Sequence, residues 1–320
     1  MKPTPIKLTW AATPTATLAV TLAALVLATA ASADPPPPPA APKTTADFIA
    51  ASRPEEWRPL DLDNTLVMTF GAGKSAIIEL APVFAPQTDA NILTLARQRF
   101  FDGLAIVRVQ DNFVTQWGDP DGDTDHARSL GQAKTKIPPE FSRRRDRSVP
   151  FTKLRDGDVF AREVGFSGGF PVARDRRDMW LTHCYGMVGA GRGDDADSGA
   201  GSELYVVIGH APRQLDRNIT VVGRVVQGMD QLAALPRGTG PLGFYEQPGQ
   251  RTPIATVRVA ADLPGGGPAG KLELLRTDSA SFGAIVEARR NRRDTWYKVP
   301  AGHIDLCSVL LPVRTRTATP

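Results

Sequence analysis

The stretch that decides the fold is FDGLAIVRVQDNFVTQWGDP, residues 101–120. Leu104–Val109 and Phe113–Trp117 are rich in β-branched and aromatic residues, and Asp111-Asn112 between them is typical of a tight turn. A strand, a turn and a second strand are therefore predicted. Before them, apolar residues recur at helical spacing, which predicts a helix from Thr88, its expected cap, to Phe101.

Similar β-rich segments recur along most of the chain and bring the predicted strands to eight. A second, short helix is expected over 228–235. Eight strands is a number at which a sheet can close into a barrel filled by side chains. The remaining predicted strands are 65–70, 75–80, 185–189, 204–208, 220–226 and 254–260.

Two segments fall outside this pattern. Residues from about 119 to 180 are polar, basic and rich in Gly and Pro, and are interpreted as a long insertion in a domain over 61–262. Residues 263–320 follow a Gly- and Pro-rich break. They are expected to form a small α/β extension with a strand at 271–275, a helix at 279–290 and a strand ending near Cys307.

The N-terminus has the three parts of a secretory signal peptide. Lys2 and Lys7 are followed by an apolar run and by Ala31-Ser32-Ala33, so 1–33 is predicted to be removed. The run is too short and too rich in Thr and Ala to span a bilayer, so no stable membrane insertion is expected. A proline-rich linker over 34–60 should follow. The mature protein is expected in the periplasm if the source is Gram-negative.

Composition narrows the function classes further. The 320 residues carry a net charge of +4, and loss of the two N-terminal lysines leaves about +2, which argues against a nucleic-acid partner. Two cysteines and four scattered histidines give no expected metal site. An oxidising compartment permits a disulfide between Cys184 and Cys307, but the sequence leaves open whether the two residues approach each other.

Three blocks in order resemble one known family. Residues 101–120 resemble the cyclophilin signature F-[YF]-D-G…F-H-R-V…F-x-x-Q-G-G-D-P. GSELYVV (201–207) is similar to its G-S-Q-F-F-I, and Leu215-Asp216 with TVVGRVVQGMD (220–230) is similar to its L-D-G…T-V-F-G-[RK]-V…G-M-D. This resemblance implies a mainly β fold, namely a closed eight-stranded cyclophilin-like barrel capped by two helices.

The resemblance also implies peptidyl-prolyl cis-trans isomerase activity on proline-containing polypeptides, without a cofactor, in a protein expected to be a monomer. By motif position, Arg108 is the catalytic residue. The positions that would bind substrate are Phe113, Gln116, Met187, Glu203, Tyr205 and Leu215. The apolar members of this set can equally pack in a barrel core, whereas an arginine on an apolar strand needs solvent or a partner.

Several positions depart from the family pattern. Val107 and Ile219 stand where the family often has histidine, Gln214 replaces a tryptophan, Glu203 a glutamine and Trp117 a glycine. These departures favour, as an alternative, a non-catalytic chaperone-like or protein-binding module.

A serine hydrolase is a third hypothesis, because residues 165–169 read G-x-S-x-G around Ser167. Gly168, Gly169 and Pro171 follow, and these residues argue against the helix that a nucleophile elbow requires.

Overall fold

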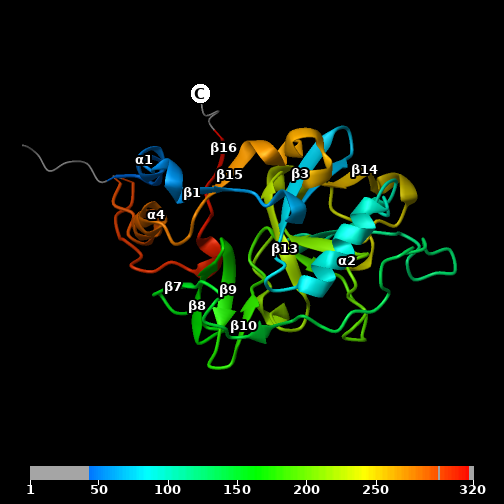
Figure 1. Ribbon diagram of the computed structural model, residues 1–320, viewed down its shortest axis with the longest axis horizontal. Coiled ribbons are helices and arrows are strands. Elements are labelled where there is room, and N and C mark those ends of the chain that lie inside the picture. The colour runs from blue at the N-terminus through cyan, green and yellow to red at the C-terminus, as the bar shows by residue number, and fades with distance from the viewer. Residues whose placement is uncertain (1–42, 295, 317–320) are drawn as a thin grey trace, which may run out of the picture. The chain divides into compact units, whose positions relative to one another are not determined.

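The computed structural model describes residues 43–294 and 296–316 (Figure 1). The predicted signal peptide and the proline run lie outside these residues. In the part of the chain that is described, no helix is long and apolar enough to cross a membrane.

The centre of the described chain is a closed barrel of eight strands, and each strand overlaps a predicted one. The alternating apolar residues of the strands fill its interior, among them Met68, Phe70 and Ile106. The prediction of a mainly β, closed eight-stranded fold is therefore confirmed. Around the barrel the strands are β11 (Met187–Ala190), β12 (Leu204–Val207), β5 (Val114–Gly118), β4 (Ala105–Val109), β14 (Thr252–Val259), β2 (Thr65–Phe70), β3 (Lys74–Leu80) and β13 (Val221–Gln227).

Two helices accompany the barrel, α2 (Pro86–Arg97) and α3 (Met229–Ala233). The expectation that Thr88 caps the first helix is wrong, because α2 begins two residues earlier. The backbone N–H groups at the N-terminus of α2 have no partner within the helix, and a carboxylate of the insertion accepts hydrogen bonds from two of them. Glu140 accepts from the backbone N–H of Gln87 (3.0 Å) and of Thr88 (2.8 Å).

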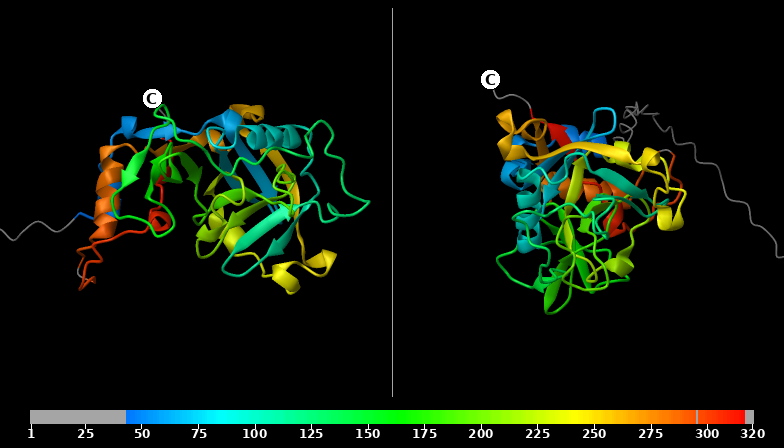
Figure 2. Two further views of the ribbon diagram at one scale, coloured as in Figure 1. Left: turned by 90° about the horizontal axis from the view of Figure 1, so that it is seen from below. Right: turned by 90° about the vertical axis from the view of Figure 1, so that its right-hand side faces the viewer.

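The insertion contains a sheet that the sequence analysis did not predict. Its strand order is β6 (Arg143–Arg144), β10 (Asp178–Leu181), β9 (Phe170–Arg174), β8 (Glu163–Ser167) and β7 (Thr152–Leu154). Its buried side chains join one apolar cluster with residues of the barrel and of α4 (Ala280–Arg290), so the sheet lies between the two (Figure 2). The rings of Phe166 and Phe282 meet edge to face at 5.2 Å.

The C-terminal extension forms a second small sheet together with residues expected in the linker. β15 (Leu272–Leu275) pairs with β1 (Trp57–Pro59) on one side and with β16 (Val313–Thr315) on the other. The predicted strand at 271–275 and helix at 279–290 are confirmed. The strand expected to end near Cys307 is wrong, because residues 306–308 form a 3-10 helix. The linker prediction is wrong from residue 45 onward, where α1 (Thr45–Ala50) and then β1 form.

The extension is fastened to the main body covalently. Cys184, just before β11, forms a disulfide with Cys307, and their Cα atoms lie 4.8 Å apart. The pairing that the sequence left open is thereby established.

The 3-10 helices of the described residues are η1 (Pro54–Glu56), η2 (Leu62–Asn64), η3 (Arg213–Leu215), η4 (Pro241–Gly243), η5 (Pro248–Gln250), η6 (Ala260–Asp262), η7 (Pro264–Gly266), η8 (Ala269–Lys271) and η9 (Leu306–Ser308).

Candidate active site

Arg108 projects from β4 and is held by three neutral acceptors. Its Nε–H donates to the backbone oxygen of Leu242 (2.7 Å) and an Nη1–H donates to Oε1 of Gln116 (3.0 Å). An Nη2–H donates to Oε1 of Gln110. A guanidinium has five N–H groups, so two remain for another acceptor. Because none of the three bonded acceptors is a carboxylate, the positive charge is not cancelled by direct contact.

Two aromatic rings flank the guanidinium. Its Cζ lies 5.4 Å from the ring centroid of Phe113 and 5.2 Å from that of Phe244, which are distances at which a cation is attracted to an aromatic face. Burial lowers the pKa of Arg108, and the nearby carboxylate of Glu203 opposes that shift. An arginine stays charged under such conditions, so this site presents a positioned cation.

Gln116 connects Arg108 to Glu203 across two strands. Its Nε2–H donates to Oε1 of Glu203, while its own Oε1 accepts from Arg108. The β5–β12 register places Gln116 opposite Tyr205, which brings these side chains onto the same surface. Burial raises the pKa of Glu203, and the hydrogen bond from Gln116 works against this rise. Glu203 therefore keeps its proton to higher pH than a solvated glutamate.

An apolar cluster adjoins this chain of polar groups. Tyr205, Val114 and Val207 form a buried cluster, separate from the barrel core, with Phe113 and Ile219 packed against it. Tyr205 lies directly over β11 at a glycine. A Cβ built on Gly189 would stand 2.3 Å from the tyrosine oxygen, so no larger residue fits there.

The hydroxyl of Tyr205 enters a buried hydrogen-bond network. It lies 2.8 Å from Nε2 of His183, and Nδ1 of His183 lies 3.0 Å from Oδ1 of Asp216. Burial alone would raise the pKa of Asp216, but hydrogen bonds from His183 and Arg213 hold it below its usual range. An ionised carboxylate only accepts, so Nδ1 donates to Asp216, and in the neutral imidazole Nε2 then accepts from the hydroxyl of Tyr205. Arg213 continues the network to Asp158 of the insertion at 2.8 Å.

The structure brings together most of the predicted site residues. Arg108, Phe113, Gln116, Glu203 and Tyr205 are connected by the contacts just described.

Two predicted positions lie further away. Leu215 is half-buried on η3, beside the network residue Asp216. Met187 packs in the apolar cluster that contains Cys184 and Phe282, not in the cluster around Tyr205, and its contact with substrate stays a prediction. It lies on β11 just after the disulfide-bonded Cys184, where burial against the small sheet and the extension takes precedence.

Four further residues at the site were not predicted: Gln110, His183, Leu242 and Phe244. For His183 the sequence offers one indication, because the hydroxyl of a buried tyrosine at position 205 needs a hydrogen-bond partner. Nothing local in the sequence indicates that the loop containing Leu242 and Phe244 returns to Arg108.

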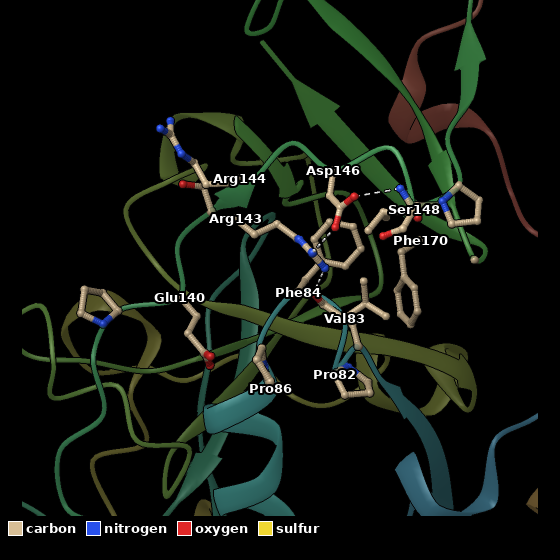
Figure 3. Close-up of a pocket in the computed structure, with 17 residues that line it drawn as sticks. Pro82, Val83, Phe84, Pro86, Glu140, Arg143, Arg144, Asp146, Ser148 and Phe170 are labelled. Atoms are coloured by element: carbon tan, nitrogen blue, oxygen red, sulfur yellow. Dashed lines mark hydrogen bonds and ion pairs between the residues drawn. The ribbon is translucent and has the colours of Figure 1, made fainter. Parts of the chain in front are cut away.

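A cavity of about 820 Å³ lies apart from this site (Figure 3). Phe84 and Phe170 belong to its apolar lining, and Arg143 reaches across to the backbone oxygen of Val83 at 2.6 Å. Ser167 also lines it, but it pairs with Phe170 in the β8–β9 hairpin. No helix follows this serine, so the nucleophile-elbow hypothesis is wrong.

A closed barrel that carries a positioned arginine beside an apolar cluster separate from its core defines the class of non-covalent prolyl isomerases. Residues 65–259 match the family model described as cyclophilin type peptidyl-prolyl cis-trans isomerase/CLD. The match covers more than half of the chain, which therefore belongs to the cyclophilin family of peptidyl-prolyl cis-trans isomerases.

Individual relatives agree with the family. A Brucella suis protein named "Probable peptidyl-prolyl cis-trans isomerase" is 28% identical over 186 residues, covering 56% of this chain and 74% of its own. A peptidyl-prolyl cis-trans isomerase of Schizosaccharomyces pombe is 46% identical over 153 residues, covering 48% and 73%. The crystal structure of a cyclophilin from Hirschia baltica superposes with a TM-score of 0.63 at 25% identity, covering 88% of this chain and all of the other.

Proposed function

We propose that this cyclophilin isomerises X-Pro bonds in exported polypeptides, and that Arg108 stabilises the twisted transition state. The observation that carries the proposal is the guanidinium of Arg108. Neutral acceptors and two aromatic rings hold it beside the apolar cluster of Tyr205, against which we place the proline and which we call the proline pocket.

The chemistry requires only rotation about one bond. Amide resonance sets a barrier of about 18–20 kcal/mol. As the bond twists, the prolyl nitrogen regains its lone pair and becomes a hydrogen-bond acceptor, which it is not in the planar state. A fixed N–H donor therefore binds the twisted state more strongly. A charged hydrogen bond contributes about 1.5–3 kcal/mol, which corresponds to about tenfold to a hundredfold in rate.

Substrate binding divides between the pocket and the polar chain. The proline ring fits against Phe113 and Tyr205, where contact with apolar surface positions it and excludes water. Among the described residues, none donates a hydrogen bond to Oε2 of Glu203, so this oxygen is free to accept a substrate backbone N–H. Gln116, whose oxygen and nitrogen are both engaged, acts mainly by orienting Arg108 and Glu203.

Export rests on two observations. The N-terminal 33 residues have the pattern of a signal peptide, and Cys184 and Cys307 form a disulfide, which persists in oxidising compartments. Fractionation of cells expressing the full chain and a chain without residues 1–33 tests this. Periplasmic recovery of the full chain alone supports export, and cytoplasmic recovery of both contradicts it. A monomer and the absence of a nucleic-acid partner belong to the same proposal.

A non-catalytic protein-binding module is the second candidate. The insertion favours it, because it adds a sheet and a large open cavity away from Arg108. Exchange NMR on an X-Pro peptide distinguishes the two. Saturable acceleration by purified protein without residues 1–33 supports the isomerase. Peptide binding without acceleration supports the module.

A further inference from the structure

The loop after α3 lies along β4 beside Arg108. The N–H of Gly238 donates to the backbone oxygen of Val109 (3.0 Å), and that of Tyr245 donates to Val107 (3.1 Å). Phe244 forms an antiparallel bridge with Arg108 itself. The loop thus extends the surface of the candidate active site on the side of Arg108 away from Phe113.

The backbone of this loop is held in an uncommon conformation. Leu242 has a φ of 57°, in the left-handed region that a leucine seldom adopts. Gly243 follows with a φ of 81°, and a Cβ there would stand 2.6 Å from Cα of Gln110. This conformation places the carbonyl of Leu242 on Nε of Arg108 while leaving the leucine side chain in solvent.

Two large apolar side chains are consequently exposed at the site. Leu242 is 66% exposed and Phe244 is 38% exposed. The ring of Phe244 lies 5.2 Å from Cζ of Arg108, and the half-buried ring of Phe113 lies 5.4 Å from the same atom. Apolar side chains therefore flank Arg108 both at Phe113 and in the loop. Exposed apolar surface next to a binding site commonly contacts ligand.

We propose that Leu242 and Phe244 form an additional subsite, which binds an apolar side chain of the polypeptide next to the proline. The inference rests on the proposed function, because it places the proline at Phe113 and its nitrogen at Arg108. Consecutive Cα atoms are about 3.8 Å apart. A residue adjacent to the proline therefore reaches the ring of Phe244. The favoured substrates are segments in which proline has an aliphatic or aromatic neighbour.

The test compares peptides that differ only beside the proline. Ala-based X-Pro peptides carry Leu or Ser at each flanking position, and both Kd and kcat/KM are measured by NMR titration and exchange. The proteins are wild type, Phe244→Ala, Leu242→Ser and, as a matched control, Leu310→Ala, whose side chain is 56% exposed elsewhere. We expect wild type and the control to favour Leu by about fivefold to tenfold at one flank. Phe244→Ala should reduce this preference to within about twofold.

Phe244→Leu keeps an apolar side chain at the subsite but removes the aromatic ring beside Arg108, so it distinguishes contact with substrate from support of Arg108. This variant should retain most of the preference for Leu, whereas Phe244→Ala loses it. An equal preference in wild type and Phe244→Ala overturns the subsite, and so does an equal loss with the Leu and Ser peptides. If wild type accelerates no peptide, the proposed function fails, and the Kd values still decide the subsite.

Discussion

Substitution of Tyr205 by phenylalanine tests the buried network behind the proline pocket. The change keeps the aromatic ring and removes one oxygen. That oxygen lies 2.8 Å from Nε2 of His183, a side chain that is 1% exposed. Since Asp216 fixes the proton of His183 on Nδ1, the lone pair of Nε2 is left without a donor.

The cost follows from that unsatisfied acceptor. A buried polar group that loses its partner costs about 1–3 kcal/mol. For a chain of this size, each kcal/mol lowers Tm by about 2–4 °C. His183→Ala should cost more, because it leaves the tyrosine hydroxyl without its partner, removes one hydrogen bond to Asp216 and creates a cavity, together about 3–5 kcal/mol. The double mutant should show a coupling of at least about 1 kcal/mol.

Urea denaturation of the two single mutants and the double mutant measures these quantities, with kcat/KM on an X-Pro peptide measured in parallel. The ring of Tyr205 stays in place in Tyr205→Phe, so kcat/KM should remain within about twofold of wild type. An unchanged or higher free energy of unfolding for Tyr205→Phe would refute the account of the network.

Three further predictions concern other parts of the molecule. Cys184→Ser should lower the free energy of unfolding by about 2–5 kcal/mol, because the disulfide closes a loop with a sequence separation of 123. The variant should retain its kcat/KM at temperatures where it is folded, and a large loss of kcat/KM there would contradict this. Asp89 is fully buried, its carboxylate has no hydrogen-bond partner, and burial raises its pKa. The folded state therefore binds this proton more tightly than the unfolded state, so the free energy of unfolding falls as pH rises above 3.8. Asp89→Asn should therefore raise the urea midpoint at pH 8 more than at pH 4, and equal shifts would refute this. Glu203→Gln removes the acidic group beside the Arg108 cation, so kcat/KM should rise about twofold to fivefold and lose any pH dependence that the titration of Glu203 contributes; a fall would contradict the assignment.

The barrel could be predicted because its strands are marked locally. Segments such as Thr65–Phe70 and Leu204–Val207 are β-rich and bounded by turns, so the pattern alone locates them. The five strands of the insertion are short and carry Arg, Asp and Gly. The faces of this sheet become buried only when the barrel and α4 pack against it, and no local pattern reveals those contacts.

The site was predictable where the motif and the register agree, as for Arg108, Phe113 and Gln116. The sequence does not predict that Met187 packs with Cys184 and Phe282, because an apolar residue on a strand does not show which cluster it joins. The sequence also does not predict that Glu140 caps α2, because Glu140 and Thr88 are 52 positions apart in the chain.

The central claim is that the cation of Arg108 stabilises the twisted X-Pro bond, and its most direct test is kcat/KM of Arg108→Ala on an X-Pro peptide. Arg144→Ala, which removes an exposed arginine from β6, serves as the matched control. Arg108→Ala should lose about tenfold to a hundredfold while Arg144→Ala stays within about twofold of wild type. A wild-type rate for Arg108→Ala would contradict the account.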